Sequence, residues 1–249
     1  MRKLISLFLV TFLAIGMAGE AHAFRFSPFR VKFTPAGQGA NQLFTVENNT
    51  DQPATVQIRV MTREVDVDGA EKNADAEKDF TVYPAQVILK PHEQRSVRIQ
   101  WMGNAALKTE KAYRVIAEQL PVNLDKEQPT SSQVKFLTSY HAALFVTPKG
   151  LTHDVTLDFS GTEKDAKGNK LLEMVFNNRG TQHALLRDLK LTVKDGRDNE
   201  VTLMGEDELD GVTGEGILAG HKRRFLLPWP KDITGKLKSI DFTFDKKAF

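Results

Sequence analysis

The sequence predicts an all-β protein that folds as two β-sandwich domains. Apolar residues recur at every second position in many short runs, which is the pattern of strands that bury one face. Clusters of Gly, Pro, Asn and Asp separate these runs, which favours a sandwich over an alternating α/β fold. The 249-residue chain is long enough for a leader followed by two domains of ordinary size.

Residues 1–23 have the three parts of a secretory signal peptide. Met1-Arg2-Lys3 is a short basic start, an apolar stretch covers residues 4–18, and Ala21-His22-Ala23 is an A-x-A cleavage site. We therefore expect cleavage after Ala23 and export of a chain that begins at Phe24. The apolar stretch is too short to span a bilayer and no later segment is as apolar, so no membrane insertion is expected.

Alternating runs mark the clearest strands in both halves of the chain. In each run the apolar residues form one face, which is expected to pack against a second sheet. The runs are Ala54–Val60, Val97–Trp101, Tyr113–Ala117, Val155–Phe159, Leu189–Val193 and Ile240–Phe244. Turn signals lie between them at Asn48–Pro53, Asp68-Gly69, Lys90–His92, Asp165–Asn169 and Asp195-Gly196.

Two short motifs of the first half recur in the second half at the same offset. Val46–Asn49 resembles Val175–Asn178, and Ile88–His92 resembles Ile217–His221. This repetition favours two copies of one module. The boundary is expected near Thr147–Gly150, which divides the mature chain into domains of residues 24–148 and 149–249. Each domain then has the size of an immunoglobulin-like sandwich.

Composition and motifs point away from catalysis, cofactors and nucleic acid. The formal net charge is only +2, whereas nucleic-acid binding depends on clustered positive charge. The chain has no Cys, and its histidines are scattered without metal-ligand spacing. No nucleophile elbow, phosphate loop or metalloprotease motif is present. We expect no enzyme activity, no metal and no cofactor; a hydrolase assembled from distant residues is a weaker alternative.

The turn Asp66-Val67-Asp68-Gly69 resembles the start of a calcium loop only superficially. Its Gly comes too early for such a loop, and Ala70 stands at a position that should supply a ligand. A hairpin between two strands explains this turn better.

The segment from Ser132 to Pro148 predicts an unusually long strand at the end of the first domain. One face would carry Val134, Phe136, Thr138 and Tyr140, followed by Ala142, Leu144 and Val146. Two interpretations fit this pattern. The face can fill the core of its own domain, or the strand can lie at an edge and offer alternate apolar side chains to a partner that lacks a strand.

The order of segments along the chain resembles one family. An Arg precedes a hydrophobic strand at Phe29–Phe33, and an Asn-rich turn follows at Asn48-Asn49. Next come a Ser-Val-Arg-Ile strand at Ser96–Ile99, an aromatic strand ending in Leu-Pro at Tyr113–Pro121, and a last strand ending at Leu144–Pro148. In this order the chain resembles the periplasmic chaperones of chaperone–usher pilus assembly, the PapD-like family.

The resemblance implies a fold and a function. It implies two immunoglobulin-like domains set at an angle around a cleft, and a periplasmic protein that binds pilus or fimbrial subunits by donor-strand complementation. The subunits would then pass to an outer-membrane usher. Val134, Phe136, Thr138 and Tyr140 would be the strand residues offered to the subunit. The free protein could cover its exposed edge by forming a homodimer.

The resemblance also implies a site for the carboxylate at the subunit's C-terminus, held by two basic residues. Arg30 matches the first. Ala143 aligns with the second, so His141 or the Tyr140 hydroxyl is expected to take its place. Thr147 stands where some members carry the Arg of an interdomain ion pair. The alternative function from another class is a secreted two-domain structural protein or adhesin in which the long strand is simply buried.

Overall fold

A computed structural model describes residues 24–121 and 137–246. Nearly all of the regular structure is β, which confirms the predicted fold class. The elements of the first half are β1 Arg25–Ser27, β2 Arg30–Phe33, η1 Gln38–Ala40, β3 Asn41–Glu47, β4 Ala54–Thr62, β5 Glu64–Val65, β6 Glu71–Lys72, β7 Phe80–Tyr83, β8 Gln86–Leu89, β9 Gln94–Trp101, β10 Lys111–Leu120 and β11 Ser139–Val146. Those of the second half are β12 Val155–Lys164, β13 Lys170–Asn178, β14 Ala184–Leu185, β15 Arg187–Asp195, β16 Glu200–Met204, α2 Gly205–Glu208, β17 Gly216–Ile217, β18 Lys222–Pro228 and β19 Leu237–Asp245. No helix of the described ranges is long and apolar enough to cross a membrane.

The first sandwich packs two sheets face to face. One sheet has the order β1-β3-β9-β7 and the other β2-β11-β10-β4-β8. The alternating residues of the predicted runs fill the space between them; Val97, Ile99, Val115 and Ala117 are all fully buried. One continuous core extends from Phe24 to Val146.

The N-terminal strand changes sheets, and this change determines which part of β11 is covered. β1 pairs with β3 in one sheet, and β2 then pairs with β11 in the other. Pro28 lies between the two strands and cannot donate a backbone hydrogen bond, which suits this crossing point. β2 is parallel to β11 and pairs with it only over Ala143–Val146.

The second sandwich has its own core. Its sheets have the orders β12-β13-β18 and β16-β15-β19, with a small β14-β17 pair beside them. Leu172, Phe176, Leu191 and Val193 are fully buried between the sheets. The sequence prediction placed Phe159 on the buried face of its strand. A shift in register between Leu157 and Phe159 instead leaves Phe159 49% exposed.

A buried asparagine closes an equivalent turn in each sandwich. The side-chain amide of Asn48 donates to the carbonyls of Gln52 and Lys90, and that of Asn178 donates to those of Gln182 and Ile217. The repeated motifs of the sequence therefore correspond to a repeated turn. Their alignment was off by one residue, since it paired Asn178 with Asn49 rather than with Asn48.

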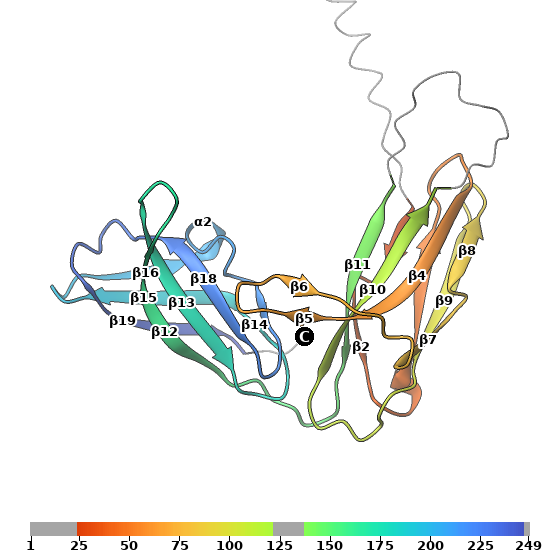
Figure 1. Cartoon of the computed structure of the whole chain (residues 1–249), viewed down its shortest axis with the longest axis horizontal. Helices are drawn as coiled ribbons and strands as arrows, with labels where there is room; N and C mark the ends of the chain where they lie inside the picture. The colour runs from red at the N-terminus through yellow and green to blue at the C-terminus, as the bar shows by residue number, and fades with distance from the viewer. Residues whose placement is uncertain (1–23, 122–136, 247–249) are drawn as a thin grey trace, which may run out of the picture.

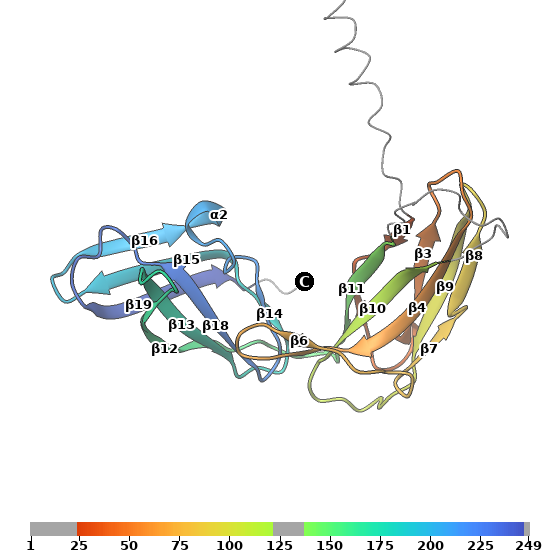
Figure 2. The same cartoon turned by 45° about the horizontal axis from the view of Figure 1, so that its top comes forward.

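The two sandwiches lie side by side at an angle (Figures 1 and 2). The predicted boundary after Pro148 falls in the segment between β11 and β12. The hairpin β5–β6 projects from the first sandwich and reaches the second (Figure 1). Its turn is Asp66–Gly69, which agrees with the hairpin interpretation. The Asp66 carboxylate accepts from the backbone N–H groups of Asp68 and Ala70.

Candidate subunit-binding cleft

The strand β11 turns alternate side chains to its own core and to the second sandwich. Ala142, Leu144 and Val146 are fully buried in the core of the first sandwich. Phe145, on the opposite face, stacks on His183 of the second sandwich with ring centroids 4.0 Å apart. Because side chains alternate along a strand, Ala143 and His141 lie on the same face as Phe145. This face of β11 therefore lines the cleft between the sandwiches.

Within the described residues, the N-terminal half of β11, from Ser139 to Ala142, has a strand partner on one edge only. β10 pairs with β11 along its whole length, from Ser139 to Val146. On the other side, the N–H of Ala143 donates to the carbonyl of Phe29, just before β2, and the N–H of Thr147 donates to that of Phe33, the last residue of β2. The direction of backbone groups alternates along a strand, so His141 and Ser139 turn their N–H and C=O groups to this same edge. The described residues place no strand there.

Arg30 lies where β2 begins to cover that edge. It is directly opposite Ala143 in the parallel register, and its side chain shares the cleft face. Partial burial and the positive charges of Arg187 and Arg114 lower the pKa of Arg30. Arg187 opens β15 of the second sandwich, and Arg114 lies on β10. Three arginines from three strands, two in one sheet of the first sandwich and one in the second sandwich, thus share this part of the cleft.

An acidic residue of the hairpin holds one of these arginines in place. Glu71 on β6 accepts two hydrogen bonds from Arg114, each 2.7 Å long, and one from Arg63 at 2.9 Å. The side chains of all three residues are no more than 23% exposed. Burial alone would raise the pKa of Glu71, but the hydrogen bonds and charges of Arg114 and Arg63 hold it at about 2.

A buried polar cluster connects the two sandwiches at the base of the cleft. The Glu110 carboxylate accepts from the His183 N–H at 2.9 Å and from the Thr147 hydroxyl at 2.7 Å, and the His183 ring Nδ1 lies 2.5 Å from it. The Glu110 and His183 side chains are 2% and 5% exposed. The sequence offered no interdomain ion pair because Thr147 occupies the expected Arg position. The structure forms the connection from Glu110 and His183 instead.

The tip of the hairpin contacts the second sandwich directly. The Arg224 N–H donates to the Val67 carbonyl at 2.6 Å, and the Arg224 side chain donates to Asp68 at 2.6 Å. Val65 packs with Phe145 and Leu218 in a small buried cluster between the sandwiches. The hairpin therefore connects Glu71, at the cleft, to strand β18.

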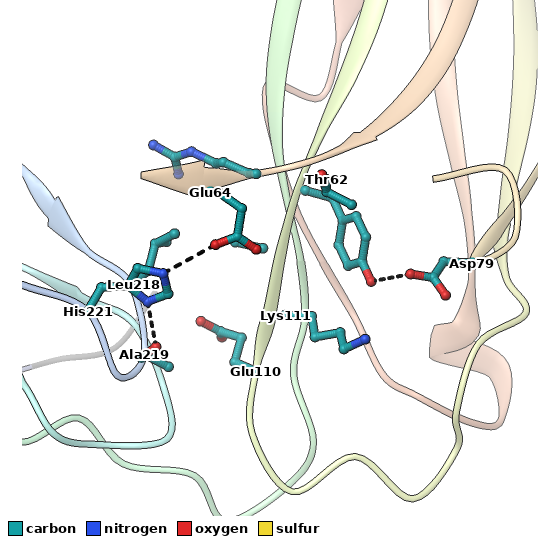
Figure 3. A pocket seen from close by; sticks show the side chains of 11 residues that line it. Thr62, Glu64, Asp79, Glu110, Lys111, Leu218, Ala219 and His221 are labelled. Carbon is teal, nitrogen blue, oxygen red and sulfur yellow. Dashed lines mark hydrogen bonds and ion pairs between the residues drawn. The ribbon is translucent and has the colours of Figure 1, made fainter. Parts of the chain in front are cut away.

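Figure 3 shows a pocket of about 190 Å³ between the hairpin and the two sandwiches. His221 lies 3.4 Å from the Glu64 carboxylate, and the Tyr113 hydroxyl donates to Asp79. Burial and the hydrogen bond to Asp79 raise the pKa of Tyr113, so its phenol stays protonated. The contact between His221 and Glu64 joins the second sandwich to the hairpin across this pocket. In the described part of the chain, no cluster of His, Asp and Glu has the arrangement of a metal site.

Of the four residues predicted to be offered to the subunit, two lie outside the described residues and two lie within them. Val134 and Phe136 lie outside the described residues, as does the predicted signal peptide. Thr138 is half-buried, and its carbonyl accepts from the Gln119 N–H. Tyr140 faces the core side, where its hydroxyl donates to the Phe24 carbonyl at 2.6 Å and its ring contacts Phe24 and Phe29.

The two residues expected to assist Arg30 lie on opposite faces of the sheet. His141 is exposed on the cleft face, two residues from Ala143, and lies 3.2 Å from the Ser139 hydroxyl. The Tyr140 hydroxyl lies on the core side and is bound to Phe24, so the structure gives no support to Tyr140 as a partner of Arg30. Sequence reasoning missed Arg114 and Arg187. Only the strand register reveals Arg114, which appears in the sequence as one more polar residue of an alternating run.

Comparison with known proteins identifies the family. Residues 24–152 match the family described as pili and flagellar-assembly chaperone, PapD N-terminal domain. This match spans more than half of the chain. The protein therefore belongs to the PapD-like chaperones of pilus assembly. A search of curated proteins found no match.

Solved structures of similar fold support the same architecture along nearly the whole chain. The class 5 fimbriae chaperone CfaA is 15% identical with a TM-score of 0.58, and the alignment covers 91% of this chain and 93% of CfaA. CsuC, solved with CsuE in a chaperone–tip subunit pre-assembly complex of Acinetobacter baumannii, is 17% identical with a TM-score of 0.58, covering 88% and 97%. The SafB chaperone, solved with the SafA pilin of Salmonella enterica, is 15% identical with a TM-score of 0.52, covering 91% and 98%. At these identities the likeness concerns the fold: two immunoglobulin-like domains.

Proposed function

We propose that this protein is a periplasmic chaperone that binds pilus or fimbrial subunits by donor-strand complementation and delivers them to an outer-membrane usher. The observation that carries the proposal is the edge of β11 between Ser139 and Ala142. Its backbone groups are turned outward, and no described strand pairs with them. A strand of a subunit added there would gain a ladder of main-chain hydrogen bonds.

The position of β2 supports a terminal carboxylate as the group that Arg30 binds. β2 occupies the same edge of β11 from Ala143 onward. A strand added to this edge on the N-terminal side of Ala143 must therefore end or turn away where it reaches Phe29 and Arg30. If the subunit's chain ends there, it runs parallel to β11, and its carboxylate meets the Arg30 guanidinium. A guanidinium can bind a carboxylate through two parallel hydrogen bonds.

Donor-strand complementation further requires apolar side chains that continue from β11 toward its N-terminal end. Val134, Phe136 and Thr138 are the residues that we propose for this task, on the sequence pattern alone. Phe136→Asp should weaken subunit binding without unfolding the protein, because a carboxylate in an apolar groove carries a desolvation cost of several kcal/mol. Unfolding of this variant would instead indicate that Phe136 belongs to the protein's own core.

Co-expression tests the function. The chain is expressed with a pilin encoded in the same gene cluster, and the soluble complex is quantified after affinity purification. We expect a one-to-one complex with the unaltered chain, loss of the complex with Arg30→Ala, and retention with Lys32→Ala. Lys32 is the matched control because it is exposed on the same face of the same strand.

Two results would count against the proposal. Insoluble or degraded pilin with the unaltered chain would favour the alternative of a secreted structural protein or adhesin. Equal pilin recovery with Arg30→Ala would show that the carboxylate site is misplaced.

A further inference from the structure

Three directly paired residues form a row across the cleft face of the first sandwich. They are Arg30 on β2, Ala143 on β11 and Arg114 on β10. Directly paired residues project from the same face of a sheet. Because neighbouring strands lie about 4.8 Å apart, the backbones of the two arginines are about 10 Å apart. Ala143 contributes only a methyl group between them, and this residue is half-buried where it packs against the small cluster of Val65, Phe145 and Leu218.

The Arg114 side chain keeps hydrogen-bond donors beyond those that it uses within the protein. A guanidinium has five N–H donors. Glu71 accepts one from Nε and one from Nη2 of Arg114, and the described residues provide no other acceptor for this side chain. The ion pair holds Arg114 on the floor of the cleft, where its side chain is 19% exposed.

The cluster around Glu71 also has an excess of positive charge. Glu71 carries one negative charge and pairs with both Arg63 and Arg114. Within the described ranges, neither arginine has a second carboxylate partner. A partly buried cluster with one unbalanced positive charge is a favourable place for an anion, because charges removed from water are stabilised chiefly by opposite charges. Arg114 is the member of this cluster that belongs to the Arg30 row.

We propose that Arg114, positioned by Glu71, binds the carboxylate at the C-terminus of the captured subunit together with Arg30. This inference rests on the function proposed above and adds a second binding residue to it. The carboxylate would lie over Ala143 between the two guanidinium groups. Arg63 pairs with the same Glu71 but lies outside the row, so it takes no part in binding the subunit.

Subunit binding by charge variants tests the inference. Arg114→Gln is compared with Arg63→Gln, with Arg30→Ala and with the double variant Arg114→Gln, Ala143→Lys. The readout is the dissociation constant of the pilin used in the co-expression test, and thermal melting verifies that each variant is folded. We expect binding about tenfold weaker or more for Arg114→Gln, the size of one lost charge-assisted hydrogen bond. Arg63→Gln should bind as tightly as the unaltered chain.

The double variant separates binding from a structural effect. A lysine at position 143 restores a positive charge at the centre of the row but cannot restore the ion pair with Glu71, so it should recover most of the lost affinity. Undiminished binding by Arg114→Gln, equal losses for Arg114→Gln and Arg63→Gln, or no rescue by Ala143→Lys would each overturn the inference. If Arg30→Ala still abolishes binding in those cases, the proposed function stands. Failure of the unaltered chain to bind the pilin would instead refute the function itself.

Discussion

Replacing Glu110 with Ala should weaken the contact between the two sandwiches and lower the stability of the protein. The Glu110 carboxylate accepts hydrogen bonds from the His183 N–H and the Thr147 hydroxyl, and the His183 ring nitrogen lies beside it. Thr147 is 2% exposed and His183 5% exposed, so water cannot easily replace the lost acceptor. The substitution leaves these buried donors without a partner.

The expected cost follows from that geometry. A buried donor left unsatisfied costs about 1–3 kcal/mol, and Glu110→Ala leaves two such donors, the His183 N–H and the Thr147 hydroxyl. We take about 3 kcal/mol as the expected cost of Glu110→Ala, within the range of about 2–6 kcal/mol for two donors. For a protein of this size, each kcal/mol lowers the melting temperature by about 2–4 °C, so a decrease of about 6 °C or more is expected.

Differential scanning calorimetry of the unaltered chain and two variants measures this effect. Glu64→Ala is the matched control, because Glu64 also faces a histidine of the second sandwich but its side chain is 69% exposed. We expect the control to melt close to the unaltered chain, since exposed ion pairs contribute little. A Glu110→Ala variant that melts within about 2 °C of the unaltered chain would show that this cluster does not stabilise the interface.

Two other features of the structure lead to measurable effects. Because the folded-state pKa of Glu71, about 2, lies below its ordinary value of 4.5, its ion pairs stabilise the protein above pH 4.5, and this contribution is lost as the pH falls towards 2. Glu71→Gln should therefore lose less stability than the unaltered chain between these pH values in stepwise urea unfolding; parallel losses would contradict the assignment. Asn178→Ala leaves buried carbonyls without their donor and should cost about 2–3 kcal/mol of unfolding free energy, whereas Asn169→Ala in an exposed turn should cost much less. Equal denaturation midpoints for these two variants would refute the structural role of Asn178.

Local patterns in the sequence were sufficient for the fold class, because a period of two in hydrophobicity results directly from the pleat of a strand. Val97, Ile99, Val115 and Ala117 were therefore assigned correctly to a buried face. Phe159 was not, because a bulge reverses the facing of side chains without a clear signal in the residues themselves. The repeated asparagine motif was visible, but its alignment depended on a turn that only the hydrogen bonds of Asn48 and Asn178 define.

Which residues come together in the cleft depends on the tertiary structure. Arg30 was identified from a resemblance, and its neighbourhood depends on contacts between residues far apart in the chain. Arg114 meets Ala143 through strand register, Glu71 reaches Arg114 through a hairpin, and Glu110 meets His183 only when two sandwiches pack together. The amino-acid sequence by itself determined which segments form strands with one apolar face and which segments form the turns between them. Which charges share one cleft depends on register and packing, and no local pattern encodes these.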